Sequence, residues 1–145
     1  MICIDKHNFG QHIAAAAGVI YNPAADHCVA RVRNGRLIGG CIYKEFTGAS
    51  IRIHAAGFVR KWIDKALVSI SFDYPFMRLG CDKLITTSHS RNPSGLEIIR
   101  RLGFIEEARI SLAYMDGDMI IFTMTRPQCR WLKSQPDPLQ RDAQI

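Results

Sequence analysis

The segment that most constrains the fold is residues 86–104, with the sequence TTSHSRNPSGLEIIRRLGF. A β-type run gives way to polar residues at Ser90, and Pro93 suits the first turn of a helix. Either Ser90 or Asn92 could cap that helix, and Gly103 suits the positive φ that often follows a helix end. The pattern predicts a strand, a polar elbow, a helix and a second strand. A ligand at the elbow would meet the free N–H groups that open the helix.

Hydrophobic periodicity predicts the other elements of the chain. Two dipeptides, Asn34-Gly35 and Asp116-Gly117, indicate hairpins, because a type I′ turn needs positive φ at both central positions. The predicted strands are residues 1–5, 27–32, 36–46, 50–55, 83–87, 104–114 and 119–126, and the predicted helices are residues 7–19, 62–79 (kinked or shortened at Pro75) and 93–102. This order predicts one mixed α/β domain over residues 1–132, followed by a polar tail over residues 133–145.

The net charge of +6 and the pI near 9.3 favour acidic partners, such as a phosphate-bearing cofactor, nucleic acid or an acidic substrate. The Lys and Arg residues are mostly dispersed and match no nucleic-acid module, so a nucleic-acid partner is the weaker interpretation. No apolar run approaches the roughly 18 residues of a membrane span, and the first residues lack a signal-peptide pattern. We therefore expect no membrane partner and a cytoplasmic protein.

The cysteines are scattered along the chain, and no Cys-x-x-Cys pair occurs. A zinc site or a disulfide framework needs clustered cysteines, so we expect reduced thiols buried in the core. The sequence contains no metal-ligand cluster, no Ser-His-Asp spacing and no paired carboxylates. It therefore predicts no metal site.

Asn92 and Leu102-Gly103-Phe104 have the identity and separation found in the GNAT superfamily of acyl-CoA N-acyltransferases, which this chain resembles. The resemblance covers roughly residues 31–132. The sequence is similar to the branch that contains ribosomal-protein N-acetyltransferases. It is closer still to small phage-encoded members, which tend to end in a Cys-Arg-Trp-Leu like residues 129–132. The other matching segments are Lys65-Ala66-Leu67, Asp73-Tyr74-Pro75-Phe76 and Leu79-Gly80-Cys81.

The resemblance implies an α+β, GNAT-like fold with a mixed, mostly antiparallel sheet of six to seven strands flanked by helices. It also implies acetyl-CoA (coenzyme A) as cofactor and an amine of a protein or small molecule as acceptor. GNAT proteins usually have two helices between their first two strands, whereas this chain has room for one. That region walls the acceptor site, so the site would be open or completed by a second protomer in a homodimer.

The family holds the CoA diphosphate at the connection after its fourth strand, in the pattern Arg or Gln, two residues, Gly, any residue, small residue. Here Phe58 replaces the Arg or Gln, Lys61 replaces the Gly, and Ile63 replaces the small residue. Arg60 and Lys61 could contact phosphate oxygens directly, and a solvated basic turn is the alternative. The cofactor-binding residues expected in this connection are Ala55, Gly57, Phe58, Val59, Arg60, Lys61 and Trp62.

The elbow supplies two further cofactor-binding residues, Asn92 and Ser94. In the family, the side chain of the residue that matches Asn92 binds the pantetheine arm, and a plain helix cap is the alternative. Ser94 lies in the first turn of the predicted helix and could either bind the pantetheine arm or cap the helix.

Acetyl transfer to an amine requires a base for the amine, a polarised thioester carbonyl and a proton for the leaving thiolate. His54, near the end of its strand and beside the expected thioester position, is the first candidate base. Packing or contact with solvent is the alternative interpretation of a lone histidine on a strand. Ser88 could protonate the thiolate, and Glu45 is a weaker candidate base.

Many GNAT enzymes use as the acid a tyrosine seven residues after the asparagine. Here that position is Ile99, which cannot donate a proton. His89 is another, weaker candidate base. Tyr114 and Asp116 lie at a hairpin end that often borders the acceptor site, although the polarity of hairpins explains them equally well.

The leading hypothesis is an N-acetyltransferase that moves an acetyl group from acetyl-CoA to an amine. One alternative is a catalytically inactive, phage-encoded GNAT-fold binding or interaction module. The degenerate loop, Ile99 and the short front helix favour this alternative. Another is a nucleic-acid-binding protein, which the charge of +6 favours.

Overall fold

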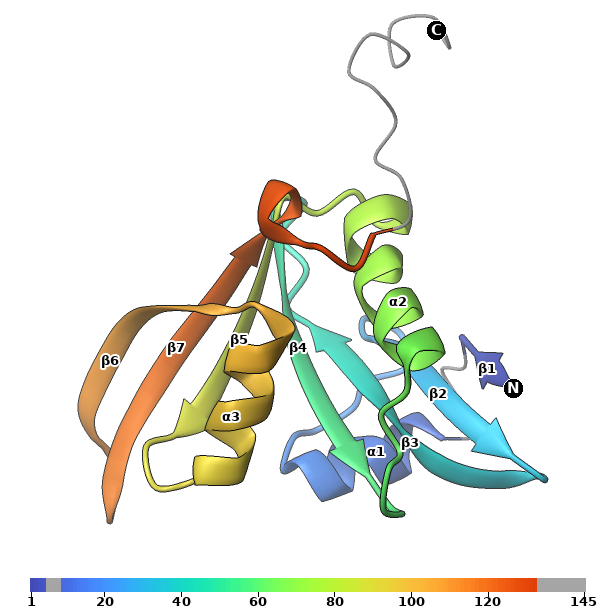
Figure 1. The fold of residues 1–145 in the computed structure, drawn as a ribbon, viewed down its shortest axis with the longest axis horizontal. Coiled ribbons are helices and arrows are strands. Elements are labelled where there is room, and N and C mark those ends of the chain that lie inside the picture. Colours follow the sequence, from blue (N-terminus) through green and yellow to red (C-terminus); the bar gives the residue numbers. More distant parts are fainter. Residues whose placement is uncertain (5–8, 133–145) are drawn as a thin grey trace, which may run out of the picture.

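The computed structural model describes residues 1–4 and 9–132, and in this part of the chain seven strands form one sheet (Figure 1). The strand order across the sheet is β1-β2-β3-β4-β5-β7-β6. Every neighbouring pair is antiparallel except β4 and β5, which are parallel. The predicted mixed, mostly antiparallel sheet of six to seven strands is therefore confirmed. The strands are β1 (Ile2–Cys3), β2 (His27–Arg33), β3 (Arg36–Lys44), β4 (Ser50–Gly57), β5 (Lys83–His89), β6 (Ile105–Tyr114) and β7 (Gly117–Thr125).

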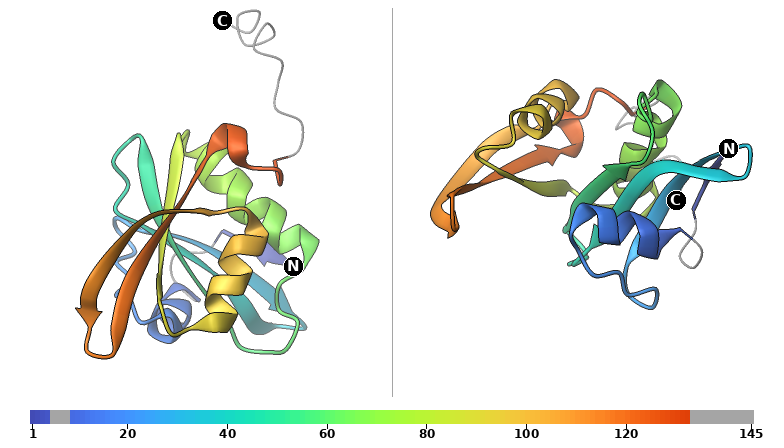
Figure 2. Two further views of the ribbon diagram at one scale, coloured as in Figure 1. Left: turned by 60° about the vertical axis from the view of Figure 1, so that its left-hand side comes forward. Right: turned by 90° about the horizontal axis from the view of Figure 1, so that it is seen from below.

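Helices cover both faces of the sheet, as the two views of Figure 2 show. The helices are α1 (Gly10–Ala17), α2 (Lys65–Asp73) and α3 (Pro93–Leu102). On one face α1 packs through Ile13 against Ile42 of β3, in a small buried cluster. On the other face α2 and α3 cover a larger cluster that includes Tyr43, Phe72 and Phe122. Ile42 and Tyr43 enter different clusters because successive side chains of a strand point to opposite faces.

The two predicted hairpins are confirmed in place, but they turn differently. Asn34 and Gly35 have φ of 51° and 74°, as a type I′ turn requires. In the second hairpin Tyr114 pairs with Gly117, so the turn falls one residue earlier than predicted. Gly117 is needed there for space, because a Cβ atom would lie 2.6 Å from Cε1 of His89.

The helix predicted over residues 62–79 begins later than expected. Asp64 caps α2, and its carboxylate accepts a hydrogen bond of 2.8 Å from the N–H of Leu67. The regular α-helix ends at Asp73, consistent with a shortening at Pro75. A π-helical turn, Tyr74–Arg78, continues the run, because a wider turn accommodates a residue without an N–H.

The remaining boundaries agree with the predicted ones to within about two residues where the structure describes them. Asn92, rather than Ser90, caps α3. Cys28, Cys41, Cys81 and Cys129 are buried thiols, as predicted, and Cys3 is half-buried. The start of the predicted helix at residue 7 and the predicted tail over residues 133–145 lie outside the described residues.

The last described residues pack on α3 of their own domain. The indole Nε1 of Trp131 donates a hydrogen bond of 2.8 Å to the carbonyl of Leu102. The guanidinium of Arg130 lies 4.5 Å from the Trp131 ring and donates to the carbonyl of Arg101. Within the described residues, no helix combines the length and the apolar character that crossing a membrane requires.

Strand β6 forms the free edge of the sheet beyond β7, and its residues are exposed up to Tyr114, which is half-buried. Its ladder with β7 is interrupted between Ile110 and Tyr114, where Leu112 has a φ of 57°. Leu112 is 85% exposed. The edge therefore presents apolar side chains and unpaired backbone groups to solvent.

The close contact of β2 and β3 under α1 makes a stability prediction. A Cβ atom at Gly40 would lie 2.3 Å from the carbonyl oxygen of Val29 and 2.7 Å from Cδ1 of Ile13. Because backbone cannot move aside easily, Gly40→Ala should lower the free energy of unfolding by about 1–3 kcal/mol, measured by urea denaturation. Gly80→Asn is the control, because Gly80 has a φ of 73° and no neighbour within 4 Å, and asparagine tolerates that conformation. Equal stability of the wild type and Gly40→Ala would contradict the packing described for this position.

Candidate active site

A cleft opens where β4 and β5 separate. Their parallel pairing is confined to three residue pairs, from Ser50 with Lys83 to Arg52 with Ile85. At the next position, Thr86 Oγ1 donates a hydrogen bond of 3.1 Å to the carbonyl of Ile53. Beyond it the strands diverge, as Figure 1 shows, and a cavity of about 600 Å³ lies along the separation.

The cavity is lined from both faces of the sheet. On one face the lining includes Trp62, just before α2, Leu67 of α2 and Ile99 of α3. On the other face the end of α1 contributes Ala16 and Ala17. Most of the lining is apolar. A long, thin ligand could therefore lie in the cleft and be reached from the opposite face of the sheet.

Asn92 holds the polar elbow at the start of α3. Its Oδ1 accepts hydrogen bonds from the N–H of Gly95 at 3.1 Å and from Ser94 Oγ at 3.2 Å. A Cβ atom at Gly95 would lie 2.5 Å from Asn92 Nδ2, so the amide folds closely over the first turn. Asn92 and Gly95 line the cleft and Ser94 is not among its lining residues. The helix uses the amide oxygen of Asn92, and the exposed Nδ2 remains able to donate to a ligand.

Trp62 closes one end of the cleft near the β4–α2 connection. Its indole lies over two glycines, since a Cβ atom at Gly57 would be 2.1 Å from Trp62 Cδ1, and one at Gly39 would be 2.4 Å from Trp62 Cε3. These glycines are paired across β3 and β4. Ala55 also lines the cleft, so of the connection residues predicted to bind cofactor, Ala55 and Trp62 are the two in its walls.

The other connection residues lie outside the cleft walls. Phe58 is 44% exposed, and Val59 is half-buried. Arg60 and Lys61 are exposed, and within the described residues no ion pair joins either of them to a carboxylate. Two cations therefore flank the entrance near α2 and are available to an anionic ligand.

Asp64 is a feature of this entrance that the sequence reasoning missed. Its Oδ1 caps α2, and its Oδ2 lies 2.7 Å from Arg31 Nη2 on β2. The position that would receive an anion at the helix N-terminus already holds a carboxylate. An Asp directly before a helical run is a cap signal in the sequence, but the hydrophobic stripe over residues 62–79 placed the helix start at Trp62, three residues before its observed start at Lys65.

His54 lies on β4 and lines the cleft, on the face covered by α1. Burial is the largest cause that lowers its pKa below 6.5, and the positive charges of Arg52 and Lys44 lower it further. The carboxylates of Glu45 and Asp26 oppose this effect. His54 is therefore a neutral imidazole at neutral pH, able to accept a proton.

The other two predicted catalytic residues lie in different surroundings. Ser88 of β5 is 8% exposed and lines the cleft. Glu45 follows β3 outside the lining, and its Oε2 lies 3.4 Å from Arg52 Nη1. Ser88 thus shares the cleft with His54, while Glu45 lies outside the lining and acts on His54 through its charge.

His89, Tyr114 and Asp116 form a cluster at the end of the cleft. The His89 and Tyr114 rings stack with their centroids 4.6 Å apart, and both line the cleft. His89 Nδ1 accepts a hydrogen bond of 2.9 Å from the N–H of Arg91, so Nε2 carries the proton and lies 2.8 Å from Asp116 Oδ1. This hydrogen bond lowers the pKa of Asp116. Because both ring nitrogens are engaged, His89 is a poor base and instead positions Tyr114.

Cys41 is the thiol in the cleft lining, and it is poorly suited to act as a nucleophile. It is 5% exposed, and its Sγ lies 3.5 Å from Ser71 Oγ. Burial raises the pKa of this thiol to about 11, although its hydrogen bond to Ser71 acts in the opposite direction. The reactive thiolate is therefore scarce at neutral pH.

Comparison with solved structures identifies the fold, although no family model and no curated protein matches the sequence. Spermidine N-acetyltransferase SpeG from Vibrio cholerae gives a TM-score of 0.63 at 18% identity, over 70% of this chain and 66% of that one. A manganese-bound structure of that enzyme gives 0.69 at 14% identity, over 86% of this chain and 91% of that one. A probable acetyltransferase gives 0.61 at 17% identity, over 71% of this chain and 62% of that one.

In two of these comparisons, the matched region spans about two thirds of the other chain, 66% and 62%. A further structure of the Vibrio cholerae enzyme contains CoA and spermine. At these identities the likeness shows the fold alone. The chain has the GNAT fold, which confirms the architecture that the Asn92 and Leu102-Gly103-Phe104 motifs implied.

The charges around His54 make a testable prediction. An NMR titration should give His54 a pKa below 6.5, because burial and nearby cations destabilise the imidazolium. Arg52→Met should raise that pKa toward 6.5, since one of those cations is lost. The same substitution at Arg78, a cation outside the cleft lining, should leave the titration unchanged. A wild-type pKa at or above 6.5 would contradict the surroundings described here.

Proposed function

We propose that this chain is an N-acetyltransferase that moves an acetyl group from acetyl-CoA to an amine. The observation that carries the proposal is the end of β4–β5 pairing after Arg52 and Ile85, which leaves the apolar cleft between the strands. The GNAT fold of the chain and the acetyltransferase activity named for its structural neighbours support the same reading.

The chain's residues fit the parts of acetyl-CoA to different extents. The backbone of β4 from Ile53 to Ala55 faces the separation, beyond the last residue pair with β5, and could hydrogen-bond an extended pantetheine arm. Asn92 Nδ2 lies at the same cleft. Arg60 and Lys61 could hold the diphosphate, whereas the carboxylate of Asp64, at the N-terminus of α2, repels it.

When bound, acetyl-CoA would supply an acetyl group activated as a thioester. A ring nitrogen of His54 accepts the proton that the acceptor amine loses as its nitrogen forms the new bond to the acetyl carbon. Ser88 Oγ and the Tyr114 hydroxyl are two groups in the cleft that can donate a proton to the departing sulfur. Ile99, in the position where many GNAT enzymes have their tyrosine, only packs.

Direct transfer between the two ligands follows from the state of Cys41. Its thiol is protonated at neutral pH, because burial raises its pKa to about 11. An acetylated cysteine is therefore not part of the proposed reaction. Both ligands must be bound at once, with the amine placed on the His54 side of the cleft.

The inactive binding module is the second candidate function. The specific observation that favours it is the carboxylate of Asp64, which meets the helix N-terminus and pairs with Arg31 at 2.7 Å. If this pair excludes the diphosphate, the cleft would take a ligand without phosphate.

Isothermal titration with acetyl-CoA tests the proposal and separates it from the alternative. We expect binding by the wild-type protein and an affinity about 3–10 times higher for Asp64→Asn, a gain of roughly 0.7–1.4 kcal/mol. Asparagine keeps the cap, removes the negative charge and releases Arg31 for phosphate. Asp73→Asn is the matched control, because Asp73 ends α2 and pairs with Arg78. No heat of binding at high micromolar concentrations of either protein would overturn the proposal.

We also infer that the chain forms a homodimer through β6, which a second copy could extend as an antiparallel strand. Ile110 and Leu112 are 47% and 85% exposed on this edge. A structural neighbour, SpeG from Vibrio cholerae, is itself dodecameric. Analytical ultracentrifugation should show a dimer for the wild type and a monomer for Ile110→Lys, because lysine blocks edge pairing. A monomeric wild type at about 100 µM would contradict the inference.

A further inference from the structure

The walls of the cleft have an unusual charge for a site that binds an amine. Among the described residues that line it, none is Asp or Glu, and Arg52 is the one with a permanent charge. An ammonium-rich acceptor would give up hydration without gaining a carboxylate partner, which is unfavourable. A polyamine such as spermidine therefore does not suit this cleft.

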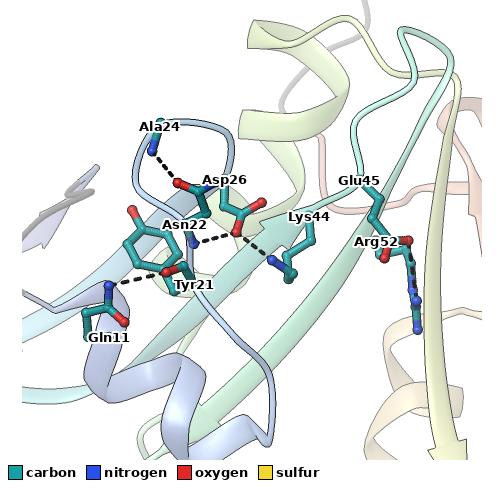
Figure 3. Close-up of polar contacts among 8 residues, drawn as sticks. All are labelled: Gln11, Tyr21, Asn22, Ala24, Asp26, Lys44, Glu45 and Arg52. Atoms are coloured by element: carbon teal, nitrogen blue, oxygen red, sulfur yellow. Dashed lines mark hydrogen bonds and ion pairs between the residues drawn. The ribbon is translucent and has the colours of Figure 1, made fainter.

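The two carboxylates that act electrostatically on His54, those of Asp26 and Glu45, are already engaged, as Figure 3 shows. Asp26 is 4% exposed, and its Oδ2 accepts hydrogen bonds from the N–H of Asn22 at 2.8 Å and from Lys44 Nζ at 2.5 Å. Glu45 faces Arg52 at 3.4 Å. Removing Asp26 from its partners would leave a buried charge unpaired, so it cannot turn to bind an acceptor.

Arg52, in contrast, has donors to spare. Its contact with Glu45 uses one guanidinium nitrogen, Nη1, and the Glu45 side chain is 61% exposed. Exposed ion pairs of this kind contribute little to stability, because water and salt screen them. A guanidinium can hold a carboxylate through two parallel hydrogen bonds, so a ligand carboxylate in the cleft could replace Glu45.

Arg52 also lies at a useful distance from the candidate base. It is the last residue of β4 paired with β5, and His54 follows two positions later on the same face of the sheet. Such neighbours are about 6–7 Å apart along a strand. A carboxylate and an amine separated by one or two carbons can span that distance with a hydrogen bond at each end.

The end of α1 completes the surroundings of the amine. The N–H groups of Gly18 and Val19 donate hydrogen bonds to the carbonyls of Ala15 and Ala14, respectively. The last two carbonyls of the helix, at Ala16 and Ala17, therefore have no partner among the described backbone hydrogen bonds. Both residues line the cleft. Carbonyls at a helix C-terminus carry partial negative charge and accept hydrogen bonds from an ammonium group.

We infer that the acceptor is an amine with a nearby carboxylate, as in an amino acid, and that Arg52 binds this carboxylate while His54 and the end of α1 face the amine. The inference rests on the proposed acetyltransferase function and names its substrate class. Two sources have this chemistry: a free amino acid, and a peptide whose first residue is Asp. The experiment separates them.

Release of CoA thiol is measured with matched acceptors: L-alanine against L-alaninamide, and the peptide Asp-Ala-Ala-amide against Asn-Ala-Ala-amide, with spermidine included. After correction for the fraction of free amine, at least one carboxylate-bearing acceptor should exceed its partner about tenfold in kcat/KM. The pair that shows the preference identifies the source. Equal rates within both pairs, or a higher kcat/KM for spermidine, would overturn the inference and leave the transferase function intact.

The variant Arg52→Met should bring the ratio of kcat/KM within the preferred pair close to one. Arg78→Met, whose cation lies outside the cleft lining, should keep the wild-type ratio, and circular dichroism checks that both variants fold. An unchanged ratio in folded Arg52→Met would contradict the role of Arg52.

Binding of the reaction product supplies a readout that needs no turnover. Ligand-observed NMR should show N-acetyl-L-alanine, or N-acetyl-Asp-Ala-Ala-amide, binding more tightly than its uncharged counterpart to the wild type and not to Arg52→Met. Equal binding of charged and uncharged products would refute the inference even if no acceptor were acetylated. Failure of acetyl-CoA to bind would instead reject the transferase function itself.

Discussion

The divergence of β4 and β5 is the constraint on which the site depends. Two parallel strands that are paired at one end and open at the other need packing on both sides to remain apart. The cluster under α2 and α3 holds Ile51 and Leu84 at the paired end, and Thr86 Oγ1 makes the last link to Ile53. Every later feature of the cleft, including the position of His54, follows from that geometry.

The sequence predicts those parts of the fold that local patterns encode. The elbow at Asn92, the turn at Asn34-Gly35 and the alternation along β4 follow from cap chemistry, positive φ and strand period, and each agrees with the structure. The predicted start of α2 is wrong because the hydrophobic stripe continues back to Ile63, before the cap at Asp64 where the helix begins.

Other parts of the site depend on contacts between residues that lie far apart in the chain. Stacking of His89 on Tyr114 joins two hairpin ends, and Arg31 reaches Asp64 from another strand. No local pattern reports such pairs. The charge of the cleft is likewise a property of the folded chain, because the composition includes 13 Asp and Glu residues and only the structure shows that the described lining contains neither.

The cleft has walls on both faces of the sheet, from α1 on one side and α2 with α3 on the other. Two ligands that approach from opposite faces do not block one another's path. If the chain is a transferase, this arrangement imposes no order of addition, and the protonated Cys41 excludes a covalent relay. Steady-state velocities should then follow a random sequential scheme, with initial-rate lines that intersect rather than run parallel.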